Sequence, residues 1–201
     1  MNKMKQIVLA TRNKGKLKEF RELFTPMGIE VLGVDEISSV PDVEEDGDTF
    51  AANAIKKAET ISQALEMPAL ADDSGLEVDA LQGQPGVLSA RFAGFHATDE
   101  ENNRKLTVML ENIPLEKRSA RFVCVLAFAI PGQKTITAQG VCEGLILTEP
   151  EGNGGFGYDP YFYVPQLKQT MAQLPPDEKN KISHRGQALL KLEKVVRERF
   201  M

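Results

Sequence analysis

The chain has 201 residues, of which 42% are hydrophobic and 26% are charged, and its formal net charge is −5. This is the composition of a globular protein with one full core, and the acidic balance argues against nucleic acid polymers and membrane surfaces as main partners. The N-terminal apolar run Ile7–Ala10 is too short for a signal peptide or a membrane span. Cys124 and Cys142 lie in apolar stretches without CxxC spacing, which indicates buried free thiols. We therefore expect a cytoplasmic protein.

The first part of the chain alternates short strands with amphipathic helices, the pattern of an α/β fold. Leu17, Phe20 and Phe24 recur at helical spacing, and Asp48 or Thr49 is placed to cap a second helix. In chain order the predicted elements are a strand over 6–10, a helix over 14–25, a strand over 29–34, an acidic loop over 35–48, a helix ending at Leu65 and a strand over 69–72.

The second part begins with a Thr98-x-x-Glu101 capping box, which predicts a helix to about Leu110. Two long strand-like runs, Ala120–Ile130 and Thr135–Leu147, are joined by a Pro-Gly-Gln turn and predict a hairpin. A glycine-rich loop (151–157), a strand (161–164) and a last helix from near Ser183 follow. We predict one α/β domain over residues 1–201, with a mixed sheet flanked by helices and a central cleft between two lobes.

Adjacent carboxylates, Asp72 and Asp73, follow the third apolar strand and precede Ser74-Gly75. We expect the strand to end here in a sharply turning polar loop, where open α/β sheets place their chemistry. Two neighbouring acids repel each other unless a cation or a shared proton offsets the charge, and a divalent metal used on phosphates is the commonest answer. The alternative is a solvated acidic turn in which Asp73 or Ser74 caps a helix.

The junction between the first strand and the first helix is suited to phosphate, because helix N-termini present backbone N–H groups and a positive dipole end. Side-chain donors stand at four of its positions, Thr11, Asn13, Lys14 and Lys16. It is not a Walker A loop, because Ala10 and Leu17 occupy positions where that motif needs a glycine and a hydroxyl residue. The alternative is a basic, solvated helix start.

Because this junction lacks the hydroxyl residue that binds magnesium in a Walker A loop, any metal ligands must come from other segments. Glu44, Glu45, Asp46 and Asp48 cluster just before the second helix. The loop that carries them would have to fold over the sheet to bring a carboxylate near Asp73. A solvated acidic loop is the alternative.

A glycine-rich loop near the end of the chain carries interleaved aromatic residues, Phe156, Tyr158 and Tyr161. Such a loop has room for a flat ligand, and aromatic faces stack on nucleobases with about 1–3 kcal/mol each. The alternative is a hairpin whose aromatic residues belong to the core.

A cationic segment opens the last helix, with Lys179, His184 and Arg185 as donors and Ser183 as a cap. These side chains suit an anion or a carbonyl oxygen. His96 stands alone among turn residues, so we expect no catalytic role for it. Two histidines without a His-x-x-x-His pair exclude a zinc hydrolase.

Taken together, these segments resemble the ITP/XTP pyrophosphatase family, whose members remove non-standard purine nucleoside triphosphates. The resemblance covers nearly the whole chain and rests on the motifs Thr11–Lys16, Glu45, Thr49-Phe50, Asn53-Ala54, Lys57-Ala58, Ala71–Leu76, Ser89-Ala90-Arg91, Phe156–Pro160 and Ser183-His184-Arg185. It implies an elongated α/β fold with two lobes, a homodimer, and Mg²⁺-dependent release of pyrophosphate that leaves the monophosphate.

The resemblance also implies roles. Glu45 and Asp73 would hold Mg²⁺, with Glu44 and Asp48 as the alternatives to Glu45. Asp73 would take the proton from the attacking water, and Asp72 would set its electrostatics. The expected substrate-binding residues are Thr11, Arg12, Asn13, Lys14, Gly15, Lys16 and Lys57 at the triphosphate, Ser74 at the nucleotide, Phe156, Gly157, Tyr158 and Asp159 at the base, and the donors Lys179, His184 and Arg185. These donors suit the C6 oxygen of hypoxanthine and xanthine, whereas adenine would leave them unpaired.

Two other functions fit parts of the pattern. A phosphatase that forms an aspartyl-phosphate would use Asp72 or Asp73 as the nucleophile, although such enzymes usually separate the two aspartates by one residue. A nucleotide sensor without catalysis is the other alternative, although a pure triphosphate binder gains little from crowded acids.

Overall fold

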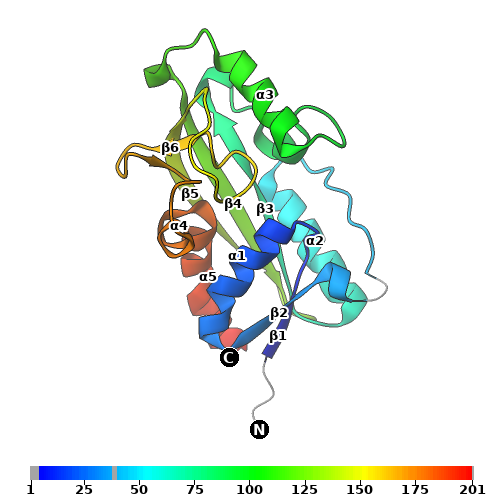
Figure 1. The fold of residues 1–201 in the computed structure, drawn as a ribbon. Coiled ribbons are helices and arrows are strands. Elements are labelled where there is room, and N and C mark those ends of the chain that lie inside the picture. Colours follow the sequence, from blue (N-terminus) through cyan, green and yellow to red (C-terminus); the bar gives the residue numbers. More distant parts are fainter. Residues whose placement is uncertain (1–4, 38–39, 201) are drawn as a thin grey trace. The chain divides into compact units, whose positions relative to one another are not determined.

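The computed structural model describes residues 5–37 and 40–200 (Figure 1). Its strands form one open, mixed sheet of seven strands in the order β2-β1-β3-β4-β5-β6-β7. β1 runs parallel to β2 and β3, whereas β6 is antiparallel to β5 and β7. The strands are β1 Lys5–Leu9, β2 Ile29–Gly33, β3 Ala69–Val78, β4 Ser119–Ala129, β5 Ile136–Ile146, β6 Phe162–Val164 and β7 Gln169–Thr170.

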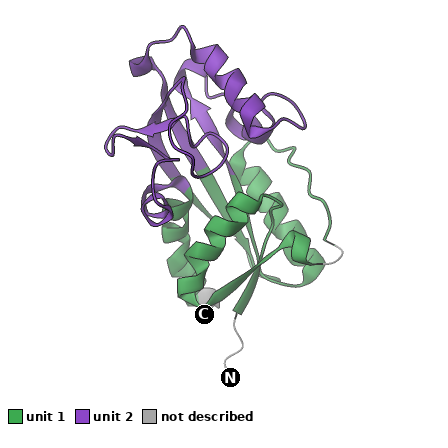
Figure 2. Cartoon of the chain, viewed as in Figure 1, with its two compact units in different colours: residues 1–73, 124–140, 185–201 green, residues 74–123, 141–184 purple. Residues whose placement is uncertain are grey.

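Five α-helices accompany the sheet within the described residues: α1 Lys14–Phe24, α2 Phe50–Leu65, α3 Asp99–Leu110, α4 Pro176–Ile182 and α5 His184–Phe200. The chain divides into two compact units (Figure 2). Unit 1 consists of residues 1–73, 124–140 and 185–201, and unit 2 of residues 74–123 and 141–184. The boundaries between the units fall inside β3, β4, β5 and α5, the last of them between His184 and Arg185.

Unit 1 has a core built on the buried strands β1 and β3. Ile7 and Leu9 are fully buried, and they belong to one cluster with Phe20 and Phe24 of α1 and Leu192 of α5. Thr49 caps α2, since its side chain accepts a hydrogen bond from the N–H of Ala52 (3.1 Å), as the sequence predicts. No described helix is both long and apolar enough to cross a bilayer.

Unit 2 has a separate core in which Leu76 and Val78 of β3 join Leu106 of α3 and Phe162 of β6. The predicted Thr98–Glu101 capping box is confirmed: each side chain accepts a hydrogen bond from the other residue's backbone N–H. The two cysteines are buried free thiols, as expected.

Two predictions about the elements are wrong. β3 does not end at Asp72 but continues through Ser74-Gly75 to Val78, because Leu76 and Val78 are apolar at alternate positions and are buried in the core of unit 2. A short helix, α4, precedes the last helix, where no element was expected. It begins with Pro176, a residue whose fixed φ and missing N–H suit a first helical position.

Candidate active site

Asp72 and Asp73 are neighbouring residues within the strand β3. Successive side chains of a strand point to opposite faces of the sheet. Asp72 contacts α1 and α5 through Lys16 and Arg185, whereas Asp73 contacts α2 through Asn53 and Lys57. The two carboxylates therefore do not form one pair, and each has its own environment.

Asp72 is fully buried in unit 1 and is surrounded by donors. Its Oδ1 contacts the ammonium of Lys16, and its Oδ2 accepts hydrogen bonds from Arg185 Nε and the Cys124 thiol, both at 3.1 Å. Arg185 also reaches Glu19 through Nη1 at 2.9 Å. Burial alone would raise the pKa of Asp72, but the charges of Lys16 and Arg185 hold it well below its usual range. Asp72 is therefore a permanent anion that fixes two cations.

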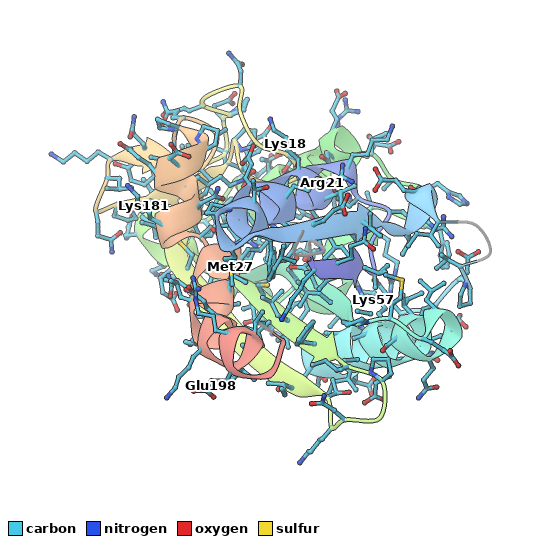
Figure 3. All side chains as sticks on the ribbon, turned by 90° about the horizontal axis from the view of Figure 1, so that it is seen from below. Lys18, Arg21, Met27, Lys57, Lys181 and Glu198 are labelled. Atoms are coloured by element: carbon cyan, nitrogen blue, oxygen red, sulfur yellow. The ribbon has the colours of Figure 1, made fainter. Side chains whose placement is uncertain are left out.

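Asp73 lies on the other face, next to a lysine that it shares with the acidic loop. Lys57 Nζ lies 2.5 Å from Glu45 Oε1, 3.6 Å from Asp73 Oδ1 and 2.9 Å from the carbonyl oxygen of Asp72 (Lys57 is labelled in Figure 3). Burial raises the pKa of Asp73, with Lys57 opposing and Glu45 adding to the effect. Burial would lower the pKa of Lys57, but Glu45 and Asp73 raise it. The acidic loop thus packs on α2, and its Glu45 shares Lys57 with Asp73.

The donor set around Lys57 fits a hard divalent cation. Carboxylate oxygens are the ligands that Mg²⁺ prefers, and Mg²⁺ is commonly held by one or two carboxylates together with substrate phosphates. Glu45 and Asp73 supply two carboxylates, while Glu44 is exposed. Among residues 5–37 and 40–200, no group of three or more His, Cys, Asp or Glu side chains could hold a metal. Glu45 and Asp73 are therefore the candidate carboxylate ligands for such a cation.

The expected phosphate loop lies at the predicted strand–helix junction, between β1 and α1. Asn13 caps α1, because its side chain accepts a hydrogen bond from the N–H of Lys16 at 3.0 Å. Arg12 extends away from the helix start and bridges Asp35 and Asp42, both at 2.6 Å. A cavity of about 240 Å³ is lined by residues of both this loop and the candidate metal site. Its lining includes Thr11, Arg12, Glu45 and Lys57.

The aromatic loop lies in unit 2 and is held by Asp159. The Asp159 Oδ2 accepts hydrogen bonds from the N–H of Phe156 (2.9 Å) and from Lys179 Nζ (2.8 Å). Lys179 Nζ also lies 5.2 Å from the centroid of the Phe156 ring. Asp159 and Lys179 are 4% and 6% exposed, so this is a buried ion pair that places an ammonium beside an aromatic face.

Three other predicted residues of unit 2 have fixed partners. Tyr158 donates from its hydroxyl to the carbonyl oxygen of Ser89 at 2.7 Å, and burial together with Asp99 raises its pKa. The N–H of Gly157 donates to Asp99 Oδ2 at 2.7 Å. His184 is buried, and its ring is stacked on Phe122 with centroids 4.8 Å apart.

The profile of the Ham1 family matches residues 7–195 of this chain. The chain belongs to the Ham1 family. One similar member, named dITP/XTP pyrophosphatase, from Desulforamulus reducens, is 54% identical over 98% of both chains. Another of the same name, from Geobacillus kaustophilus, is 53% identical over 94% of this chain and 93% of its own. A HAM1 protein structure from Coxiella burnetii has a TM-score of 0.86 at 48% identity, covering 97% of this chain and 100% of that one.

Sequence reasoning missed several residues of this candidate site. Asn53 belongs to one of the motifs that carry the family resemblance, but no role was predicted for it. Cys124 was predicted only to be a buried thiol. Glu19 and Ser89 were not considered as partners of Arg185 and Tyr158. All four act through pairings distant in sequence, 20 residues for Asn53 with Asp73 and 166 for Glu19 with Arg185. One signal was available: Asn53 and Lys57 are four residues apart on α2 and so share a helix face.

Proposed function

We propose that this protein hydrolyses the non-canonical purine nucleoside triphosphates ITP, dITP and XTP to the monophosphate and pyrophosphate. The observation that carries the proposal is the buried lysine, Lys57, that joins Glu45 to Asp73 beside the cavity at the β1–α1 junction. This is a site for a polyanion and a divalent cation. Relatives that are more than half identical over nearly the full chain are named dITP/XTP pyrophosphatases, which supports the substrate class.

In the proposed mechanism Glu45 and Asp73 would hold Mg²⁺. The bound ion would neutralise charge on the phosphate oxygens. Asp73 takes the proton from the water that attacks the α-phosphorus, and pyrophosphate leaves. Asp72 remains ionised, and its role is to hold Lys16 on the opposite face of β3.

The triphosphate is bound by cations and by the start of α1. We assign this role to residues 11–16 and to Lys57, because the first turn of a helix supplies N–H groups and a positive dipole end. Within this set the guanidinium of Arg12 binds Asp35 and Asp42, which makes it a contact of the acidic loop as well as a candidate phosphate ligand.

The base is recognised by the aromatic loop of unit 2. We propose that it stacks on Phe156, with Gly157, Tyr158 and Asp159 shaping the surroundings and Ser74 contacting the nucleotide. Lys179 and His184 supply donors to the C6 oxygen. Adenine has a donor at C6 and would leave these groups unpaired, at about 1–3 kcal/mol each.

We further propose that the enzyme is a cytoplasmic homodimer that acts on free nucleotides. The net charge of −5 disfavours a nucleic acid polymer or an anionic membrane as a partner. Size-exclusion chromatography with light scattering tests the dimer directly.

The test of the function is a panel of ITP, dITP, XTP, ATP and GTP with Mg²⁺, in which pyrophosphate and orthophosphate are both measured. We expect pyrophosphate as the product, with ITP and XTP far faster than ATP. Orthophosphate together with a trapped aspartyl-phosphate would indicate a phosphatase instead. Binding without any turnover would indicate a sensor, and equal rates on all nucleotides would refute the proposed specificity.

A further inference from the structure

Asn53 is a buried amide at the centre of unit 1 to which the proposed reaction assigns no task. It lies in the first turn of α2 and is only 1% exposed. A buried side-chain amide must satisfy two donors and an acceptor within the protein, so the partners of Asn53 show what it holds.

Those partners belong to two separate segments. Asn53 Oδ1 accepts from the N–H of Gly47 at 2.8 Å, and Asn53 Nδ2 donates to the carbonyl oxygen of Gly47 at 3.3 Å. The same Nδ2 donates to Asp73 Oδ2 at 3.1 Å. The Asn53 amide thus forms hydrogen bonds with the backbone of the acidic loop at Gly47 and with the carboxylate of Asp73 in β3.

The grip on Gly47 also sets the direction of Glu45. Exposure alternates along this part of the loop: Asp42, Glu44, Asp46 and Asp48 are exposed, while Val43, Glu45 and Gly47 are half-buried. Glu45 lies two residues before Gly47 on the less exposed side of the loop, so fixing the Gly47 backbone against Asn53 limits where the Glu45 carboxylate can reach. Lys57, one helical turn after Asn53, receives the Glu45 carboxylate there.

The contact is too close for any residue larger than glycine at position 47. A Cβ added to Gly47 would lie 2.7 Å from Asn53 Oδ1 and 3.0 Å from the Cβ of Ala52. The backbone conformation of Gly47 is not in the left-handed region, so the close approach to Asn53 is the reason that a side chain does not fit here.

We propose that Asn53 is a positioning residue that fixes Glu45 and Asp73 relative to each other, so that the two carboxylates are preorganised to share one divalent cation. This inference rests on the proposed function, because it takes these two carboxylates as the metal ligands. Partners that orient metal ligands typically contribute 10- to 100-fold to metal affinity or activity. Asn53 orients both ligands at once, one directly and one through the backbone of Gly47.

The test is a calorimetric titration of Mn²⁺ into the nucleotide-free protein, with wild type compared with Asn53→Ala. We expect the variant to bind Mn²⁺ about 10- to 100-fold more weakly. Gly47→Ala is the second variant, because it separates the loop from Asn53 without removing a polar group, and it should weaken binding in the same direction. The Mg²⁺ concentration for half-maximal hydrolysis of ITP should rise in both variants.

Asn102 supplies a matched control in unit 2. It is 3% exposed, and its amide makes the same kind of grip, accepting from the N–H of Ala93 (2.7 Å) and donating to the carbonyl of Ala90 (3.2 Å). Asn102→Ala should lose stability, as Asn53→Ala should, but bind Mn²⁺ as wild type does. A purely structural role for Asn53 would make the two variants alike in Mn²⁺ affinity.

Folded Asn53→Ala with the Mn²⁺ affinity of wild type would overturn the proposal, as would wild-type protein that binds no Mn²⁺. If Asn53→Ala does not fold, Gly47→Ala decides: weakened binding supports the proposal and unchanged binding refutes it. A wild-type protein that binds Mn²⁺ but releases no pyrophosphate from ITP would refute the proposed function alone, since the metal titration uses no nucleotide.

Discussion

The two units hold their candidate functional groups by different means. In unit 1 the groups are charged and their partners are other charged groups: Lys16 on Asp72, and Lys57 between Glu45 and Asp73. In unit 2 the central group is an aromatic ring, Phe156, on a loop held by backbone hydrogen bonds and one buried ion pair. Removing one partner of a buried charge pair leaves the other charge unpaired, whereas truncating a ring removes contact area. We therefore expect changes in unit 1 to affect chemistry and stability most, and changes in unit 2 to affect binding of the base.

The largest expected effect is on catalysis in unit 1. Asp73→Asn keeps the size of the side chain but removes the proposed base and metal ligand. It should lower kcat by at least about 10²–10⁴-fold, the usual contribution of a general base, while nucleotide binding is partly retained. Initial rates of pyrophosphate release from ITP measure it. Asp79→Asn, at an exposed acid of unit 2, is the control and should be active. A near-normal rate in Asp73→Asn would exclude Asp73 as the base.

The second prediction separates the two neighbours on β3 by stability. Asp72→Asn leaves Lys16 and Arg185 without their shared buried anion, which should cost about 3–5 kcal/mol of unfolding free energy. Asp73→Asn should cost little or even stabilise the protein at neutral pH, because burial raises the pKa of Asp73 and so already disfavours its charge. Urea unfolding of both variants measures the difference. Equal losses would mean that the opposite environments of the two carboxylates have no energetic consequence.

The third prediction tests whether unit 2 binds the base of the substrate. Phe156→Ala removes the proposed stacking surface and should raise the KM for ITP about tenfold, since base–aromatic stacking contributes about 1–3 kcal/mol. The kcat should change much less, because no charged group of unit 1 is altered. Phe95→Ala is the matched control in the same unit, as its ring is 86% exposed. A loss confined to kcat would show that Phe156 does not bind the base.

Features set by neighbouring residues could be predicted from the sequence. The caps at Thr49 and Thr98 depend on residues three positions away, and both predictions are confirmed. The core periodicity of α1 and the strand–helix junction after β1 are local in the same sense. The candidate phosphate, metal and aromatic segments could also be proposed from the sequence, because clustered acids, cations and glycines are visible in the chain itself; their roles stay predictions.

Features set by distant pairing could not be predicted. The adjacency of Asp72 and Asp73 suggested a shared cation at the end of a strand, but β3 continues and places the two on opposite faces. Only the fold shows that Arg185, 113 residues from Asp72, is its partner. Asn53 is a similar case, because an amide in a helix reveals its acceptors only once the loop and the strand lie beside it.

The smallest expected effect concerns pH and the exposed start of α3 in unit 2. The backbone N–H and the hydroxyl of Thr98 lower the pKa of Glu101 below 4.5. A lowered folded-state pKa contributes stability that is present above the unfolded value and is lost as the pH falls through the folded value. The stability difference between wild type and Glu101→Gln should therefore be present at neutral pH and vanish in acid. Urea unfolding across the acid range measures it, with Glu100→Gln, which lacks the capping bond, as the control. A difference independent of pH would mean that the charge of Glu101 does not strengthen the cap of α3.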